Sequence, residues 1–364
     1  MQVTRVETTN FRNLIKQTIC LEPTFNLIVG RNGQGKTNFL EALSVLSNSK
    51  SFRSAQTEDL INHSEKQAQI RSEILSFEVV SRIEAILHRD RKEFFIDGRK
   101  LKSFSELIGK LSSIYFYPAD LGLIKDGPTY RRTFVDKHRT LINPTALTKF
   151  YELSRVVKNK LRLIKDLQKI TPKDLEPWNK LLAETSIEVW KERDNFIKQI
   201  GAEARALYFE ITDGTGELRL RLKNNNLDKS NMDFDILFGT ISARASEEIA
   251  RRTLLVGAQQ DEIEITIDGK DTRKFASQGE ARSIVLALKM ATITSFENER
   301  KESPLVLFDD VDAELDIRRK ELFFNILLQK NRQIIVTSTE ELSQKITKGR
   351  EYKIIKAEGG FLEG

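Results

Sequence analysis

A glycine-rich motif at residues 30–37 reads Gly-Arg-Asn-Gly-Gln-Gly-Lys-Thr and matches the pattern G-x-x-x-x-G-K-[ST]. A short apolar run at residues 25–29 precedes the motif, and apolar residues at helical spacing follow it between residues 39 and 46. This order predicts a strand, a tight loop and a helix, which is the setting of a nucleoside triphosphate site. An ordinary glycine-rich turn is the alternative interpretation, and both flanks argue against it.

Phosphate binding uses each part of this motif. Glycines let successive backbone N–H groups point inward at phosphate oxygens, and the following helix aims its positive end at the same point. We expect Lys36 to reach the β- and γ-phosphates of ATP and Thr37 to offer its hydroxyl to Mg²⁺. The expected nucleotide contacts of the loop are Gly30, Arg31, Asn32, Gly33, Gln34, Gly35, Lys36, Thr37 and Asn38.

Composition places the chain among globular proteins. Its 364 residues, 39% of them hydrophobic and 31% charged, suffice for one large domain or two ordinary ones. The sequence contains neither an apolar run of about 18 residues nor an evident secretory signal, so we expect a cytoplasmic protein without a membrane span. The single cysteine, Cys20, is expected to pack in the interior, and three scattered histidines predict no metal cluster. A net charge of +6 is compatible with a polyanionic partner.

The order of periodic segments predicts a mixed α/β head that is interrupted by a helical arm. Residues 1–120 are expected to combine the nucleotide loop with an antiparallel β lobe. Its strands are expected at the alternating runs 69–75, 77–80, 82–87 and 93–96, the last closed by an Asp-Gly turn.

Helical periodicity replaces this alternation from residue 121 to residue 207, which we expect to form the arm. A second arm helix is expected after Pro177. Residues 208–364 are expected to complete the head, beginning with a strand at 217–222 that returns to the main body. The other segments expected there are a helix at 242–255 that packs on the arm, strands at 262–267, 305–308 and 334–336, and a long helix from residue 277 to residue 294.

Two acidic residues, Asp309 and Asp310, follow the apolar run 305–308 directly. Acids at the carboxyl end of a buried strand lie where α/β sheets bind ligands, which is the Walker B arrangement. We expect Asp309 to hold Mg²⁺ and Asp310 to orient or activate the attacking water. A solvated acidic turn after a buried strand is the alternative interpretation.

A third segment, residues 277–280, reads Ser-Gln-Gly-Glu at the start of the long helix. Its hydroxyl and exposed N–H groups suit an anion, but Ser followed three residues later by Glu is also a capping box. Ser277 precedes Asp309 by 309 − 277 = 32 residues. With that spacing before the Walker B strand, the segment resembles the signature motif of ABC-type ATPases. Residues 313–316, Ala-Glu-Leu-Asp, resemble the D-loop of the same proteins. Thr337-Ser338-Thr339 stands where ABC transporters usually carry a histidine.

These motifs, in this order and with a long gap between Lys36 and Asp309, resemble the ATPase heads of the SMC and Rad50 class. More specifically, the chain is similar to the RecF family of bacterial recombination mediators. The matching stretches are residues 10–13, 30–38, 116–121, 130–136, 277–279 and 309–316. Three positions depart from the family pattern: Ala119, the segment Ala258-Gln259-Gln260, and Glu280.

The resemblance implies an ABC-type ATPase head with a helical arm and a weak, DNA-stimulated ATPase used as a switch. It implies that Arg12 helps to bind phosphate or base and that Ser277, Gln278, Gly279 and Glu280 bind the nucleotide of a second subunit. It further implies an ATP-dependent homodimer that binds double-stranded DNA at single-strand gaps and works with RecR and RecO in repair and replication restart.

Two groups of basic residues are candidates for phosphate contacts, and solvated charged surfaces are the alternative interpretation for each. The first comprises Arg155, Lys158, Arg162 and Lys165; the second comprises Arg89, Arg91, Lys92, Arg99, Lys100 and Lys102. Two other functions also remain open: a non-hydrolysing module in which ATP only cements a dimer, and the ATPase subunit of a transporter. The missing switch histidine and the long helical insertion argue against the transporter.

Overall fold

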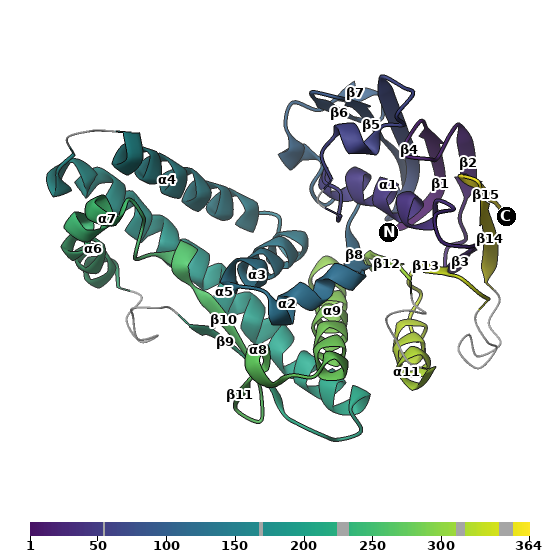
Figure 1. Ribbon diagram of the computed structural model, residues 1–364. Coiled ribbons are helices and arrows are strands. Elements are labelled where there is room, and N and C mark those ends of the chain that lie inside the picture. The colour runs from purple at the N-terminus through teal and green to yellow at the C-terminus, as the bar shows by residue number, and fades with distance from the viewer. Residues whose placement is uncertain (54, 167–169, 224–232, 311–316, 342–351) are drawn as a thin grey trace. The chain divides into compact units, whose positions relative to one another are not determined.

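The computed structural model describes residues 1–53, 55–166, 170–223, 233–310, 317–341 and 352–364 (Figure 1). The chain forms two compact units. The first comprises Met1–Asp120 and Phe296–Gly364, and the second comprises Leu121–Ser295. The first boundary falls where the arm was expected to begin, but residues 208–295 belong to the second unit together with the arm helices.

The central sheet of the first unit has the strand order β15-β14-β3-β13-β12-β8. Every neighbouring pair is parallel except β14 and β15. The strands are β3 (Phe25–Val29), β8 (Ser113–Phe116), β12 (Leu305–Phe308), β13 (Ile334–Ser338), β14 (Lys353–Glu358) and β15 (Phe361–Glu363). The apolar runs expected as strands at 25–29, 305–308 and 334–336 are therefore confirmed. The residues of β8, β12 and β13 are buried, as near-continuous apolar runs in a parallel sheet require.

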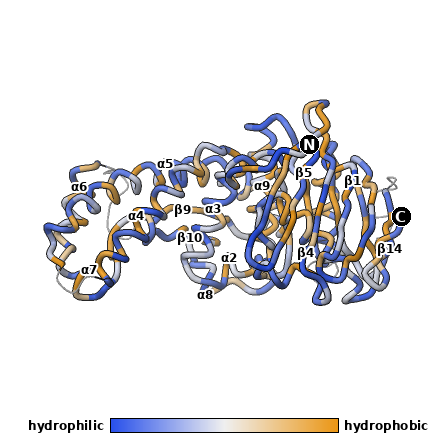
Figure 2. Tube along the Cα trace, turned by 90° about the horizontal axis from the view of Figure 1, so that it is seen from above, coloured by the Kyte–Doolittle hydropathy of each residue, from blue (hydrophilic) through white to orange (hydrophobic). Residues whose placement is uncertain are grey.

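The expected β lobe is a second sheet of the first unit, with the antiparallel order β2-β1-β4-β5-β6-β7. Its strands are β1 (Gln2–Thr9), β2 (Gln17–Cys20), β4 (Gln67–Ser76), β5 (Val79–His88), β6 (Lys92–Ile96) and β7 (Arg99–Lys100). Figure 2 shows the alternation of apolar and polar residues along β4 and β5. Alternate side chains of these strands enter the core because successive residues of a strand point to opposite faces.

One expected strand of the lobe was wrong. Residues 77–80 do not form a strand of their own, because Phe77 and Glu78 are the turn between β4 and β5. Their φ angles of 46° and 64° are those of a tight hairpin turn, which neither residue type signals in the sequence. The expected turn after β6 is confirmed, with positive φ at both Asp97 and Gly98.

One hydrophobic core joins the lobe, the central sheet and helix α1 (Lys36–Asn48). Leu40, Leu43 and Leu46 of α1 are fully or almost fully buried in it, beside Ile28 and Leu307 of the central sheet. The helix that begins in the nucleotide loop is thereby held by packing on both sheets. Helix α11 (Ile317–Leu327) is a further helix of this unit.

The second unit is mostly helical, as expected for the arm. Its helices are α2 (Gly122–Lys125), α3 (Pro128–Ile142), α4 (Ala146–Asp166), α5 (Glu176–Ile211), α6 (Phe234–Ala243), α7 (Ala245–Arg251), α8 (Thr272–Phe275) and the greater part of α9 (Gln278–Arg300). Pro177 occupies the first turn of α5, where a missing N–H costs nothing. Short 3₁₀ helices occur at η1 (Glu58–Leu60) and η2 (Phe104–Glu106) in the first unit. Three more, η3 (Pro118–Leu121), η4 (Pro172–Leu175) and η5 (Ala258–Gln260), precede α2, α5 and β10.

Two expectations about the second unit need correction. The strand at 217–222 does not return to the central sheet. As β9 (Leu218–Lys223) it pairs with β10 (Glu262–Ile267) in a three-stranded sheet that also holds β11 (Lys270–Asp271). The helix expected at 242–255 is instead the end of α6 and all of α7. The two helices meet at Arg244, which is the C-cap residue of α6 and the N-cap residue of α7.

Cys20 was also predicted wrongly, because it is exposed at the end of β2, an edge strand of the lobe. A lone cysteine carries no periodic signal that separates a core position from a surface one. None of the helices among the described residues is both long enough and apolar enough to cross a membrane.

Candidate nucleotide site

The glycine-rich loop joins β3 to α1 in a conformation that only glycine adopts without strain. Gly33 and Gly35 have φ angles of 82° and 105°. Gly30 is required for a different reason, since a Cβ atom there would collide with the backbone oxygen of Ala357 on the neighbouring strand β14. The sequence motif therefore corresponds to real backbone demands at its three glycines.

Lys36 is buried at the first turn of α1, and its ammonium group turns back over the loop. Its Nζ donates to the carbonyl oxygen of Gly30 and to that of Arg31, the second at 3.1 Å. A phosphate oxygen offers the same donor a stronger, charge-assisted partner. The amine is thus already placed inside the loop that the sequence assigns to phosphate.

The carboxylate of Asp309 lies at the end of β12 and accepts two hydroxyl hydrogen bonds. Thr37 Oγ1 donates to Asp309 Oδ1 at 2.9 Å, and Thr337 Oγ1 donates to the same oxygen at 2.8 Å. Burial raises the pKa of Asp309, the two hydroxyls oppose this rise, and the charge of Asp310 adds to it. A buried carboxylate of this kind is stabilised by a bound cation.

Asp310 lies one residue further, with a φ angle of 53° that is unusual for aspartate. Its N–H donates to Thr337 Oγ1 at 2.8 Å, which holds the strained residue in place. Thr337, in the segment where transporters carry the switch histidine, is therefore hydrogen-bonded to both acids, to the side chain of Asp309 and to the backbone of Asp310. The D-loop expected at residues 313–316 lies outside the described residues.

These side chains line one cavity of about 360 Å³ in the first unit. Its lining residues are Arg12, Asn32, Gly33, Gln34, Gly35, Lys36, Thr37, Asn38, Arg53, Asp309, Asp310 and Thr337. Gly30 and Arg31, also predicted as contacts, are not among them and act through their carbonyls on Lys36. The size is that of a small-ligand site, and glycine N–H groups, cations and hydroxyls suit a polyphosphate.

Arg12 enters this cavity from the β lobe. Its Nε donates to Oε2 of Glu41 at 2.8 Å and its second guanidinium nitrogen donates to Oε1 at 2.9 Å. Glu41 is fully buried on α1, so this forked pair fixes the direction of the arginine. The predicted contact of Arg12 with phosphate or base remains a prediction, with the guanidinium now held at the cavity wall.

Arg53 is the site residue that the sequence did not indicate. Its guanidinium donates to Asn38 Oδ1 at 3.2 Å and lies 3.8 Å from the carboxylate of Glu41. Asn13 lies in residues 10–13, one of the stretches that resemble the RecF family, and no role was predicted for it. Its side-chain amide donates to the carbonyl of Gly33 and accepts from Asn38. Neither residue belongs to a local sequence pattern. The available signal was Glu41, an acid among the apolar residues of α1, because a buried carboxylate needs a cation as its partner.

Mg²⁺ would find two protein oxygens here, the Thr37 hydroxyl and the Asp309 carboxylate. These are hard donors of the type that Mg²⁺ takes together with waters and substrate phosphates rather than in an all-protein cage. The residues thus fit the ion. Among the described residues, no cluster of three or more His, Cys, Asp or Glu side chains suited to a metal occurs.

Ser277 and Glu280 form a complete capping box at the start of α9. The N–H of Ser277 donates to Glu280 Oε2 at 2.8 Å, and the N–H of Glu280 donates to Ser277 Oγ at 3.2 Å. Ser277 and Gln278 are exposed, while Gly279 and Glu280 are half-buried. All four belong to the second unit, and none lines the cavity of the first. The capping interpretation is confirmed, and the contact with a partner's nucleotide remains a prediction.

Known proteins share both this sequence and this fold. The family model of the RecF/RecN/SMC N-terminal domain matches residues 2–361. The chain is 31% identical to the DNA replication and repair protein RecF of Clostridioides difficile (strain 630), over 99% of this chain and 97% of that protein. The chain belongs to the RecF family.

Solved structures agree with this membership of the RecF family. A structure described as the recombination mediator protein RecF-ATP in the RecFOR pathway has a TM-score of 0.89 and 26% identity, covering 100% of this chain and 97% of that one. An Smc head bound to the C-terminal winged-helix domain of ScpA has a TM-score of 0.58 at 19% identity, covering 100% and 96%. The expected fold, an ABC-type ATPase head with a β lobe and an inserted helical arm, is confirmed.

One of the stretches that carry the RecF resemblance, residues 130–136, contributes to a buried ionic cluster in the second unit. Arg193 of α5 donates to Asp136 of α3 at 2.8 Å and to Asp261 at 2.7 Å. The indole N–H of Trp190 also donates to Asp261, and burial raises the pKa of this carboxyl to about 6 against the pull of Arg193. The cluster therefore ties α3 and α5 to the residue that precedes β10.

Arg131, on the same helix α3 as Asp136, links this region to the segment that precedes Ser277. Its Nε donates to Glu262 at 2.7 Å, and Glu262 also accepts from Arg273 of α8 at 3.1 Å. Arg273 is the fourth residue before Ser277 in the sequence. Glu262 thus links the arm to the short helix that leads into the capping box.

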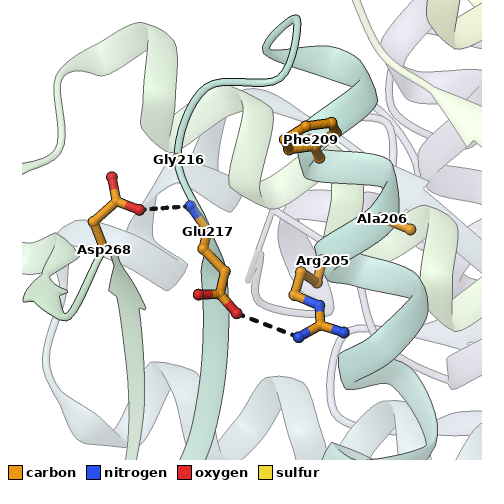
Figure 3. A pocket seen from close by; sticks show the side chains of 6 residues that line it. All are labelled: Arg205, Ala206, Phe209, Gly216, Glu217 and Asp268. Atoms are coloured by element: carbon orange, nitrogen blue, oxygen red, sulfur yellow. Dashed lines mark hydrogen bonds and ion pairs between the residues drawn. The ribbon is translucent and has the colours of Figure 1, made fainter.

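A hollow of about 480 Å³ lies in the second unit, where the end of α5 approaches the start of β9 (Figure 3). Arg205 donates to Glu217 at 3.3 Å, and the N–H of Glu217 donates to Asp268 at 2.8 Å. Phe209, 56% exposed, lies one turn beyond Arg205 on α5 and is an apolar side chain of this lining. The charged groups of this hollow are bonded to one another, which joins α5 to the ends of the paired strands β9 and β10.

Proposed function

We propose that this chain is an ATP-dependent DNA-binding protein of recombinational repair and replication restart. The observation that carries the proposal is the Thr37–Asp309–Thr337 arrangement at the mouth of a loop lined with N–H groups and cations. Such a site fits a nucleoside triphosphate with its magnesium ion. The name of the C. difficile relative supports the role in replication and repair, and the RecF-ATP structure supports ATP as the nucleotide.

In the proposed site each residue has one task. The loop N–H groups and Lys36 hold the phosphates, Thr37 and Asp309 hold Mg²⁺, and Asp310 orients or deprotonates the attacking water. The ion supplies charge neutralisation for the transferred phosphoryl group. Hydrolysis acts as a switch, so we expect a weak ATPase that DNA stimulates.

The switch is proposed to work on the assembly state. Ser277, Gln278, Gly279 and Glu280 bind the γ-phosphate held by a second subunit, so ATP stabilises a homodimer and hydrolysis removes the bridge. The exposure of Ser277 and Gln278 supports this role. Two such sites, each with about 1–3 kcal/mol of coupling, would shift the dimer equilibrium by orders of magnitude.

The proposed ligand is double-stranded DNA at the edge of a single-strand gap, bound in the cytoplasm. RecR and RecO are the proposed partners, in accord with the pathway named for the related structure. The positive net charge of the chain supports a polyanionic ligand.

Two variants test whether ATP is hydrolysed or only bound. Asp310→Asn should accumulate ATP-bound dimers and lose phosphate release, whereas Lys36→Ala should lose nucleotide binding itself. Phosphate release and binding of a fluorescent ATP analogue are measured for both. Unchanged phosphate release in the Asp310→Asn protein would favour the alternative, a non-hydrolysing module in which ATP only cements the dimer.

Molar mass measured by light scattering tests the dimer. The protein is examined alone, with ATP, and with ATP plus gapped duplex DNA, with the Lys36→Ala variant as control. We expect the mass to double with ATP in the wild type only. A monomer under every condition would contradict the action of Ser277 in trans.

A further inference from the structure

Helix α4 of the second unit has a row of exposed basic residues along one face. Five of its residues recur at alternating steps of four and three, and every one is exposed: Tyr151, Arg155, Lys158, Arg162 and Lys165. With 3.6 residues per turn they fall within an arc of about 80°. The buried residues of the helix, Leu153, Val156, Lys160 and Ile164, occupy the opposite side. We call the five exposed residues the α4 basic stripe.

Three of the four cations of this stripe have no carboxylate partner in the described part of the chain. Among the described residues, Arg155, Lys158 and Lys165 make no ion pair, and Arg162 pairs only with Asp166 across an exposed contact of 3.1 Å. Two carboxylates of α5 that contact α4, Glu188 and Glu192, are both bonded to Lys149.

Cations elsewhere on α4 and in the β lobe behave differently. Lys160, on the buried side of the same helix, is paired with Glu248 at 2.7 Å. In the β lobe, Arg82, Arg91, Arg99 and Lys100 each contact a carboxylate. Exposed pairs of that kind reduce the positive potential that a phosphate would meet. Arg89, Lys92 and Lys102 make no ion pair among the described residues of the lobe, but they are interspersed with paired cations. The unpaired cations of the stripe, Arg155, Lys158 and Lys165, instead share one face of a single helix.

We propose that the α4 basic stripe binds the phosphate backbone of duplex DNA. This proposal rests on the proposed function and names the part of the second unit that meets the ligand. The stripe spans about 21 Å along a straight helix, a length that matches about six base-pair steps of duplex. Cations on a rigid helix fit a regular, stiff backbone, and the Tyr151 hydroxyl adds a neutral donor to phosphate at one end.

The composition of the stripe argues for the duplex over a single strand. Surfaces that bind single strands interleave cations with aromatic rings on which bases stack. The stripe carries one aromatic residue, Tyr151, at its end. Contacts to phosphate alone carry no sequence information, so binding through the stripe is independent of base sequence.

Charge-matched variants of the full chain test the stripe. The stripe variant combines Arg155→Gln, Lys158→Gln, Arg162→Gln and Lys165→Gln. The control combines Arg82→Gln, Arg91→Gln, Arg99→Gln and Lys100→Gln, which removes the same number of charges from the paired cations of the lobe. The affinity for a duplex of about 30 base pairs is measured with ATP at about 50 and 200 mM NaCl, beside affinities for single-stranded DNA and for ATP.

We expect four lost phosphate contacts to flatten the dependence of log affinity on log salt by about 3.6, from about 0.9 for each contact. Over this salt range the wild type then loses about 100-fold more affinity than the stripe variant. The control keeps the wild-type salt dependence, and both variants keep the wild-type affinity for ATP, which reports an intact first unit.

Three results would overturn the proposal while leaving the proposed function in place: a stripe variant with wild-type affinity and salt dependence, equal losses in both variants, or a loss confined to single-stranded DNA. A wild-type protein that binds no duplex with or without ATP would contradict the proposed function as well. The two failures are therefore distinguishable.

Discussion

The hydroxyl of Thr37 donates to the carboxylate of Asp309 at 2.9 Å, although 272 residues separate them in the chain. The contact exists because β13 lies between β3 and β12 in a parallel sheet, so the carboxyl ends of all three strands meet at one edge. Thr337, at the end of β13, fills the space between the other two and bonds to the same carboxylate oxygen. A site with these components forms only when the two distant parts of the first unit fold together.

The Thr37 hydroxyl should matter only when Mg²⁺ is present. Thr37→Val keeps the shape of the side chain but removes the oxygen, so we expect ATP affinity in Mg²⁺ to fall by about tenfold or more. Thr37→Ser, which keeps the oxygen, is the matched control and should stay near the wild type. Titration of a fluorescent ATP analogue, with Mg²⁺ or with EDTA, checks this. A loss of the same size in EDTA would show that Thr37 acts by packing instead.

Arg53 should contribute to nucleotide binding and Arg31 should not. Arg53 lines the cavity, and a charge-assisted hydrogen bond to phosphate contributes about 1.5–3 kcal/mol, so Arg53→Gln should weaken ATP binding by about tenfold or more. Arg31 is exposed in the glycine-rich loop but is not among the lining residues, so Arg31→Gln is the matched control. Equal affinities of the two variants, measured by calorimetry, would remove Arg53 from the site.

Lys160 and Glu248 form a fully buried ion pair between α4 and α7. Burial lowers the pKa of Lys160 against the opposing pull of Glu248. Lys160→Met leaves a buried carboxylate without its cation and should destabilise the second unit by about 3–5 kcal/mol. The double variant Lys160→Met with Glu248→Leu should recover most of that loss, since both charges are gone.

Urea unfolding followed by tryptophan fluorescence measures these changes. The two tryptophans of the chain, Trp178 and Trp190, both lie in the second unit and report on it alone. If the double variant is no more stable than Lys160→Met, the cost of the single variant comes from lost packing and not from the unpaired charge.

Protonation of His138 should make the stability of the second unit depend on pH. The side chain is buried on α3, where desolvation, then Lys137 and Lys289, hold its pKa well below the ordinary 6.5. Its Nδ1 bonds to the Phe134 carbonyl at 2.8 Å, and because a carbonyl only accepts, Nδ1 carries the proton of the neutral ring.

The neutral form is favoured in the fold, so the unfolded chain takes up the proton first as pH falls. Stability from this residue is therefore present above pH 6.5 and lost below it, by up to about 1.4 kcal/mol at pH 5.5. His138→Met has no titrating group and is the control. The free energy of unfolding of both proteins is measured at pH 7.5 and 5.5, and parallel losses in the two would contradict the prediction.

Several parts of the site were predictable because they depend on local patterns. The glycines of residues 30–37, the buried run before Asp309 and the capping box at Ser277 each carry their chemistry within a few consecutive residues. The parallel strands were recognisable because burial on both faces requires continuous apolar runs. Positions where a turn needs unusual φ angles without glycine, as at Phe77 and Glu78, gave no such signal, and the hairpin was divided wrongly.

Other parts depended on contacts between distant segments. Arg53 is one of many arginines in the sequence, and only its approach to Glu41 and Asn38 places it in the cavity. The strand at 218–223 read as part of the head because strand periodicity does not say which partner a strand takes. Its pairing with β10 instead assigns residues 208–295 to the second unit.

By itself the sequence determined the chemistry of the nucleotide loop, the acids at the end of β12, the helical nature of the arm and the family. These are written in local spacing, since a phosphate loop, a buried strand or an amphipathic helix is specified by neighbours in the chain. Only the tertiary structure decided that Thr337 bonds to both acids and that Arg12 is held by Glu41. It also decided that three cations of the α4 basic stripe make no ion pair in the described part of the chain, while four cations of the β lobe each contact a carboxylate. Distances between side chains far apart in the chain set those properties, and they exist only after strands and helices have packed.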